Sequence, residues 1–318
     1  MYDTGDDRPR FVIDESTLDF RGMSVPDLEE NLEEFVQTVL DLTLTGETVA
    51  ASALVYDTEC DEDLELWKFC FPGQASSVPR DTLLRLQLTL DRCPTWDPDI
   101  EGLDTEVTVD GTTPPVALSV GYALHTARNG HNTACVVFAG RRRGWLPVHA
   151  GEQAYEVYFL HEPDAVTLFW RALFARENIP EARFMELARS AFPQLVLAPS
   201  LTFRNFSNPY LHLRDWVVHT LSVINDHFPQ ALQDGASIPA QVQAALGHHG
   251  VTLSPESPKT RANSKAMAQR DVPHGDDVYR CEWHAKKEPT RDRVHFSLPD
   301  ERLGGRILVG IFVDHLDT

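Results

Sequence analysis

The residues best suited to chemistry lie near the end of the chain, in the stretch YRCEWHAKKEPTRDRVHF. His284 and Lys286 alternate there, and Arg293 and His295 alternate a few positions later. Side chains two positions apart share one face of a β-strand. Histidines can transfer protons, and Lys or Arg can stabilise charge on a phosphate. We therefore predict these four residues, with His315 after the last apolar strand, as a catalytic group.

A hairpin would bring the two alternating pairs together. A four-residue turn over residues 288–291, with Pro289 second, suits a type I turn. The predicted pairs are Lys286 with Arg293, His284 with His295, and Glu282 with Ser297. Like charges directly opposite destabilise a sheet, and a bound anion would offset that cost. A solvated face with ordinary surface charges explains the same pattern, so both interpretations stay open.

The cationic hairpin stands in an acidic chain of 318 residues with a formal net charge of -20. Residues 1–70 hold 19 Asp or Glu against 4 Lys or Arg, whereas residues 259–295 hold 6 against 9. The balance excludes a general nucleic-acid coating role, which needs many surface cations. It permits RNA or another nucleic acid to bind locally at the C-terminal face, and it predicts a protein partner for the acidic N-terminal region.

A polar and basic stretch, residues 254–270, precedes the hairpin. Its hydroxyl, ammonium and guanidinium groups could bind phosphate. The predicted phosphate-binding residues are Lys259, Arg261, Lys265 and Arg270. A mobile linker is the alternative for this stretch.

The order of elements predicts an α+β fold. Residues 1–160 form an acidic mixed α/β region, in which residues 25–40 have helical apolar spacing after a Ser24 start. Residues 161–232 form a helical region, residues 233–273 a linker or clamping loop, and residues 274–318 a cationic β-rich module.

Other residue groups carry weaker predictions. Cys281 and His284, with His295 or His315, could bind zinc, but Cys281 and His284 face opposite sides of a strand. We therefore predict no metal site. The basic run 141–143 favours an internal salt bridge to the acidic N-terminal helix over phosphate binding. The histidines at 219, 227, 248 and 249 suit structural positions, although Asp226–His227 could be a catalytic pair.

The composition also bears on cofactors and location. No dinucleotide, P-loop, zincin or hydrolase motif is present, so we expect no cofactor. No run of eighteen apolar residues occurs, which argues against a membrane span. The five cysteines are scattered without a CxxC pair. Together with the polar N-terminus, this pattern predicts free thiols in the cytoplasm.

Residues 278–318 resemble the sheet of RelE/ParE-type ribonuclease toxins. The resemblance rests on Arg293 before an apolar strand, RILVGIFVDHL, which ends in Asp314–His315. It implies a metal-independent ribonuclease in a bacterial defence or toxin system, and the chain also resembles uncharacterised phage-defence proteins. Two alternatives stay open: a non-enzymatic accessory subunit that binds nucleic acid or protein in a larger defence complex, and a DNA mimic that binds a basic partner.

Overall fold

The computed structural model describes residues 8–71, 77–114, 116–140, 142–235 and 238–317. The chain divides into two compact units, Met1–Phe169 and Trp170–Thr318, here called unit 1 and unit 2. Helices accompany several sheets, including a largely antiparallel one near the C-terminus, so the α+β prediction is confirmed.

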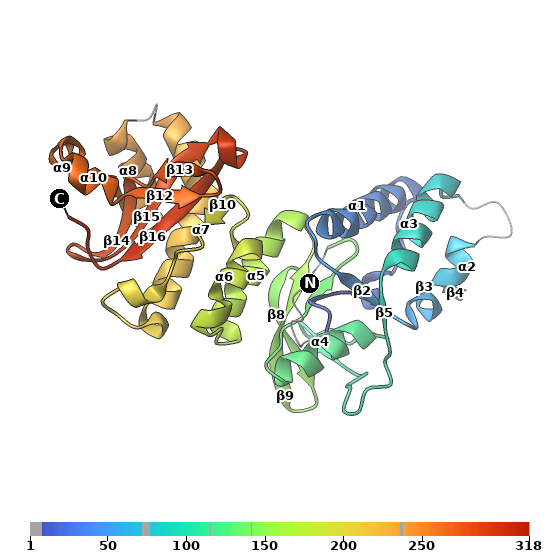
Figure 1. Cartoon of the computed structure of the whole chain (residues 1–318). Helices are drawn as coiled ribbons and strands as arrows, with labels where there is room; N and C mark the ends of the chain where they lie inside the picture. The colour runs from blue at the N-terminus through green and yellow to red at the C-terminus, as the bar shows by residue number, and fades with distance from the viewer. Residues whose placement is uncertain (1–7, 72–76, 115, 141, 236–237, 318) are drawn as a thin grey trace. The chain divides into compact units, whose positions relative to one another are not determined.

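Unit 1 is built on a seven-stranded sheet, ordered β5-β2-β1-β7-β9-β8-β6 (Figure 1). The strands are β1 (Phe11–Ile13), β2 (Val49–Ser52), β5 (Thr95–Trp96), β6 (Thr108–Val109), β7 (Ala134–Val136), β8 (Gly144–Ala150) and β9 (Gln153–Leu160). The run from β5 to β9 is parallel, and β8 and β6 add antiparallel edges. Every residue of β1, β2 and β7 is buried, as expected when both faces of a parallel sheet are covered.

Helices cover both faces of this sheet. Figure 1 shows α1 (Val25–Leu44) and α3 (Arg80–Arg92) on one side and α4 (Leu118–Arg128) on the other. Val12 of β1 and Cys135 of β7 pack with α4 in one apolar cluster. A short helix, α2 (Leu66–Cys70), follows the small hairpin of β3 (Glu59–Asp61) and β4 (Leu64–Glu65).

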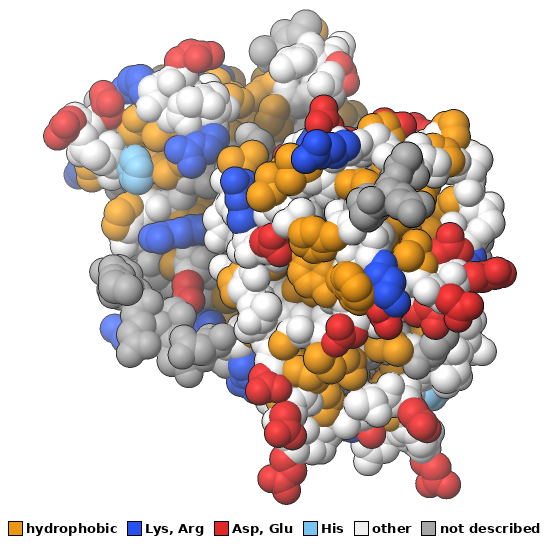
Figure 2. Space-filling view, turned by 90° about the vertical axis from the view of Figure 1, so that its right-hand side faces the viewer, with side chains coloured by type: hydrophobic (Ala, Val, Ile, Leu, Met, Phe, Trp, Pro, Cys, Tyr) orange, Lys and Arg blue, Asp and Glu red, His pale blue; other side chains and the backbone are white. Residues whose placement is uncertain are grey.

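The predicted acidic helix is α1. It begins after Ser24, whose hydroxyl accepts from the backbone N–H of Asp27. Its buried side includes Leu28, Leu32 and Phe35, and the other side carries acidic residues. Figure 2 shows acidic side chains spread around the face of unit 1 turned to the viewer, with apolar ones between them.

Unit 2 contains a five-stranded sheet, ordered β10-β16-β15-β14-β11. The strands are β10 (Leu195–Leu197), β11 (Thr252–Pro255), β14 (Trp283–Glu288), β15 (Arg291–Asp300) and β16 (Arg306–Val313), and β12 (Asp271–His274) and β13 (Asp277–Arg280) form a separate hairpin. Only β10 is parallel to its neighbour in the five-stranded sheet.

The helices of unit 2 are α6 (Glu181–Ala191), α7 (Tyr210–Asp234), α8 (Pro239–Gly247), α9 (Pro258–Ala262) and α10 (Ser264–Ala268), and α5 (Val166–Arg176) crosses the boundary between the units. The long helix α7 supplies the core under the hairpin. The ring of Phe228 lies 5.1 Å from Trp283 and 4.9 Å from Phe296, centroid to centroid. These contacts place Trp283 and Phe296 in the core.

The structure places folded elements in the stretch predicted as a linker or clamping loop. Residues 238–273 contain α8, β11, α9, α10 and most of β12. The strand β11 pairs with β14, with Ser254 opposite His284. This stretch is therefore part of the C-terminal sheet and its covering, which excludes a mobile linker for its described residues.

A β-bulge at Gly310 shapes the middle of this sheet. His295 pairs with Ile311 and Phe296 with Val309, so Gly310 is the extra residue of β16. A Cβ atom at Gly310 would lie 2.5 Å from Sγ of Cys281 and 2.7 Å from Cγ2 of Val272. Only glycine fits here without displacing both neighbours.

We predict that Gly310→Ala lowers the free energy of unfolding of unit 2 by roughly 1–3 kcal/mol, the usual cost of overpacking a core. Urea unfolding of the full chain measures the loss. Gly247→Ala is the matched control, because a Cβ there meets no atom within 4 Å. Equal stability of the two variants would contradict the prediction.

Candidate functional site

The C-terminal hairpin has the predicted register. Lys286 pairs with Arg293 and His284 with His295, and the turn closes between Glu288 and Arg291. Glu282 lies just before β14, where its carboxylate binds Arg261 at 3.1 Å. The local pattern of alternation and a proline turn was therefore sufficient to fix which side chains meet.

The face that carries these residues is buried. His295 is 0% exposed, His284 3% and Arg293 7%. The segment 256–270 lies over this face, since Glu256 contacts both histidines and forms an ion pair with Arg270. The burial excludes the solvated-face interpretation for these three side chains.

Glu256 is the centre of this buried group. Its Oε1 accepts a hydrogen bond from Nε of Arg270 at 2.7 Å. The same oxygen lies 3.5 Å from Nδ1 of His284 and 3.9 Å from Nδ1 of His295. On the other side of His284, Nε2 lies 3.3 Å from Oγ of Ser254.

The sequence prediction placed Arg270 in a phosphate-binding surface, and the structure corrects this. Arg270 is 0% exposed. Besides Glu256, it donates to the carbonyl oxygens of Ala266 at 2.7 Å and Asp317 at 3.0 Å. A guanidinium so enclosed holds the fold together and is not available to a phosphate.

Burial and neighbouring positive charge keep both histidines neutral. Burial, and then His295, lowers the pKa of His284 to about 2. Burial, and then Arg270, lowers the pKa of His295 to about 3. Burial also lowers the pKa of Lys286 and of Arg293.

Several buried polar atoms of this group have no hydrogen-bond partner among the described residues. They include Nδ1 of His284, Nδ1 of His295, Nε of Arg293 and Oδ1 of Asp314. Buried polar atoms in native proteins are nearly always satisfied, by protein, water or an ion. Their concentration in one place marks the hairpin face as the candidate site.

The other predicted residues lie at the periphery. Lys286 is half-buried, and Lys259 and Lys265 are exposed on α9 and α10. Arg261 is exposed but occupied by Glu282. His315 is exposed after β16, and its charge contributes to the lowered pKa of His295. The structure therefore brings His284, Lys286, Arg293 and His295 together and leaves the remaining lysines on the outside.

Prediction from sequence missed the role of Glu256, which was visible only as one polar residue of a loop. It also missed Asp292, a buried residue with φ +50° at the start of β15. Asp292 accepts hydrogen bonds from Ser207 and Asn208. A buried carboxylate in a hairpin strand has no local sequence signal, because its donors are distant in the chain.

Asp226 and His227, the alternative catalytic pair, contact other residues. Asp226 makes two hydrogen bonds with Arg171, at 2.6 and 2.8 Å. His227 stacks on His249 at 3.9 Å, and His219 contacts the backbone oxygen of His249. Cys281 packs beside Gly310 and is not among the residues grouped around Glu256.

Unit 1 contains a buried charged group at the carboxyl end of β1. Nη1 of Arg142 lies 2.8 Å from Oδ2 of Asp14, and Oε1 of Glu15 accepts from the N–H of Ser119 at 2.8 Å. The basic run thus forms an internal salt bridge as predicted, but its partner follows β1 and is not the acidic helix. Arg141 lies outside the described residues.

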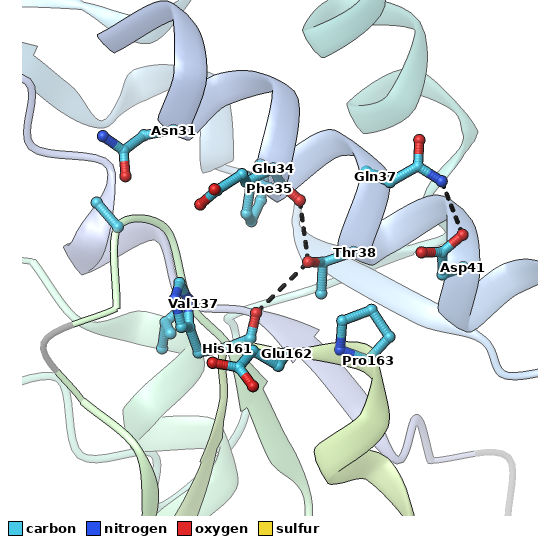
Figure 3. Close-up of a pocket in the computed structure, with 11 residues that line it drawn as sticks. Asn31, Glu34, Phe35, Gln37, Thr38, Asp41, Val137, His161, Glu162 and Pro163 are labelled. Carbon is cyan, nitrogen blue, oxygen red and sulfur yellow. Dashed lines mark hydrogen bonds between the residues drawn. The ribbon is translucent and has the colours of Figure 1, made fainter. Parts of the chain in front are cut away.

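A pocket of about 430 Å³ opens at the carboxyl ends of the parallel strands (Figure 3). It is lined by α1 and by the residues after β7 and β9, including Glu34, Asp41, His161 and Glu162. Ligands of open α/β sheets bind outside the carboxyl ends of the strands. The position suits a small ligand, and the three carboxylates favour a positively charged one.

Comparisons with protein-family models, curated proteins and solved structures found no match. The resemblance to ribonuclease toxins therefore stays a prediction. Among the described residues, no helix has the length and apolar character needed to cross a membrane.

The Glu256–Arg270 pair gives the first prediction from this site. Removing one partner of a buried ion pair costs about 3–5 kcal/mol, whereas replacing both by apolar residues costs far less. We expect Arg270→Met to destabilise unit 2 severely and Arg270→Met/Glu256→Leu to recover most of the loss, both measured by urea unfolding. If the losses in the free energy of unfolding from the two substitutions simply add in the double variant, the prediction is refuted. Arg261→Met, which breaks the exposed pair with Glu282, is the control and should change stability little.

Glu15 gives a prediction for pH. Burial, and then Asp14, raises its pKa from 4.5 to about 7. The folded state therefore holds this proton more tightly than the unfolded state, so the free energy of unfolding falls as pH rises from 4.5 to 7. The full effect is on the order of 3 kcal/mol.

Glu15→Gln should remove that loss, because an amide keeps the bond to Ser119 and does not ionise. Relative to the parent chain, we expect the variant to gain stability on the order of 3 kcal/mol between pH 4.5 and pH 8. Urea unfolding at each pH, followed by hydrogen exchange in peptides of unit 1, measures this difference in stability. Glu30→Gln on the exposed side of α1 is the control, and a constant difference across pH would contradict the prediction.

Proposed function

We propose that unit 2 binds the phosphate groups of a nucleic acid, with RNA as the first candidate. The observation that carries the proposal is the pairing of Lys286 directly opposite Arg293. Two like charges in this position repel one another. Among the described residues neither has an ion-pair partner within 4 Å, although Glu256 and Asp314 act on them from farther away. A bound anion would attract both side chains and so offset this repulsion.

The exposed lysines Lys259 and Lys265 support the same proposal. They lie on the short helices that cover the hairpin face, in the part of the chain with a net positive balance. A nucleic acid supplies several phosphates, and the half-buried Lys286 together with outer lysines would contact more than one. The surrounding acidic chain would confine binding to this region.

Ribonuclease activity is the narrower form of the proposal. A neutral imidazole can accept a proton from a ribose hydroxyl, and a second must then donate one. With pKa values of about 2 and 3, both histidines are neutral at pH 7 but too weakly basic to accept a proton efficiently, and neither is protonated to act as the acid. Binding without cleavage, as in an accessory subunit of a defence complex, therefore fits the geometry more closely.

The test is fluorescence anisotropy with labelled single-stranded RNA and DNA over a range of salt concentrations. We expect Lys286→Ala to weaken RNA binding about tenfold and to reduce the salt slope by about 0.7, the value for one phosphate contact on a single strand. Lys287→Ala is the matched control, because this neighbouring half-buried lysine donates to the backbone of His212. Equal affinity of the two variants, or no binding by the parent chain, would refute the proposal.

Incubation of the same RNA with the protein, with and without a chelator, separates binding from cleavage. Cleavage that survives chelation, together with growth arrest of expressing cells, would support the predicted toxin-like nuclease. Binding without cleavage would support the accessory subunit. In either case the partner of the acidic N-terminal region stays a prediction.

A further inference from the structure

The buried group around Glu256 has the composition of a metal site. Glu256, His284 and His295 each offer one ligand atom, and these atoms lie within 4.8 Å of one another. All three residues are buried. We propose that Glu256, His284 and His295 bind a divalent transition-metal ion.

The distances are close to those of a coordination sphere. Zinc bonds of about 2.0–2.1 Å at tetrahedral angles place two ligand atoms about 3.4 Å apart. Oε1 of Glu256 lies 3.5 Å from Nδ1 of His284 and 3.9 Å from Nδ1 of His295. Both Nδ1 atoms are buried without a hydrogen-bond partner among the described residues. The group is thus slightly wider than a metal-bound set, with its nitrogens free to bind.

The surroundings orient His284 and Glu256 as metal sites require, whereas Nε2 of His295 has no hydrogen-bond partner among the described residues. A metal-binding imidazole normally uses its second nitrogen in a hydrogen bond, which fixes the tautomer. Nε2 of His284 lies 3.3 Å from Oγ of Ser254, so Nδ1 is left for the metal. Arg270 holds the carboxylate of Glu256 through the same Oε1, and a carboxylate oxygen has a second lone pair for an ion.

Neighbouring positive charge limits which metals suit the site. Arg270, Arg293 and Lys286 all oppose a cation, and only one carboxylate lies in the ligand set. Magnesium and calcium need several oxygen ligands and would be excluded. Two imidazoles and one carboxylate suit zinc, cobalt or ferrous iron, with modest affinity.

This inference goes beyond the proposed function, because it concerns the interior of unit 2 and not its phosphate contacts. It also revises the expectation from sequence. The zinc alternative failed there because Cys281 and His284 face opposite ways. The structure supplies Glu256 in place of the cysteine, directly after a strand whose pairing the sequence did not indicate.

The test is titration of the full-length, metal-stripped protein with zinc chloride by calorimetry and with cobalt chloride by visible absorption. We expect one equivalent to bind with micromolar affinity and to raise the melting temperature. His284→Ala and His295→Ala should each weaken binding by at least about tenfold. Ser254→Ala keeps all three ligands and should weaken it less.

His249→Ala is the matched control, because the exposed His249 stacks on His227 and could bind a metal adventitiously. It should leave the affinity unchanged. Absence of stoichiometric binding by the parent chain would overturn the proposal, as would binding lost in His249→Ala but kept in His284→Ala. The parent titration needs no variant, and circular dichroism checks that each variant is folded.

Lys286→Ala separates this proposal from the proposed function. The substitution should weaken RNA binding but leave zinc binding intact or stronger, since it removes a positive charge near the ion. Loss of RNA binding with retained zinc binding would support both proposals. Unchanged RNA binding with zinc bound at His284 and His295 would leave only the metal site standing.

Discussion

The buried ion pair between Arg270 and Glu256 is the interaction on which the C-terminal site depends. A charged carboxylate in the interior is costly unless it is paired, and Arg270 pairs with Glu256 at 2.7 Å. The other nitrogens of Arg270 hold the carbonyls of Ala266 and Asp317. One guanidinium thus fixes β11, α10 and the C-terminal tail over the hairpin, and so buries the histidine pair.

The same part of the fold sets the charge of the histidines. Burial is the main reason that the imidazoles of His284 and His295 stay neutral, and neighbouring positive charges, including Arg270, add to it. Neutral imidazoles do not attract phosphate, but their ring nitrogens can bind a metal ion. The positive charge that could bind phosphate belongs to Lys286 and Arg293, the next cross-strand pair on the same face. The hairpin therefore separates a neutral interior from a charged outer end.

The parts of this arrangement that the sequence predicted are local ones. The hairpin register follows from alternation and from Pro289, and α1 follows from apolar periodicity. The missed parts join distant residues. β10 pairs with β16 from the far end of unit 2, and Arg142 reaches Asp14 across 128 positions. Glu256 is the clearest example. Its place beside the histidines depends on the pairing of β11 with β14, which neither alternation nor a turn motif in the sequence predicted.

In the fold, not every acidic residue of unit 1 contributes charge to the surface. Asp14 and Glu15 count toward the net charge of -20, yet both are buried at the carboxyl end of β1. One is neutralised by Arg142, and burial keeps the other protonated up to about pH 7. The acidic groups of the pocket beside α1, such as Glu34 and Glu162, are by contrast placed to meet a small ligand. A phosphate would be repelled there and attracted at Lys286, so a single anionic ligand can account for unit 2 but not for unit 1.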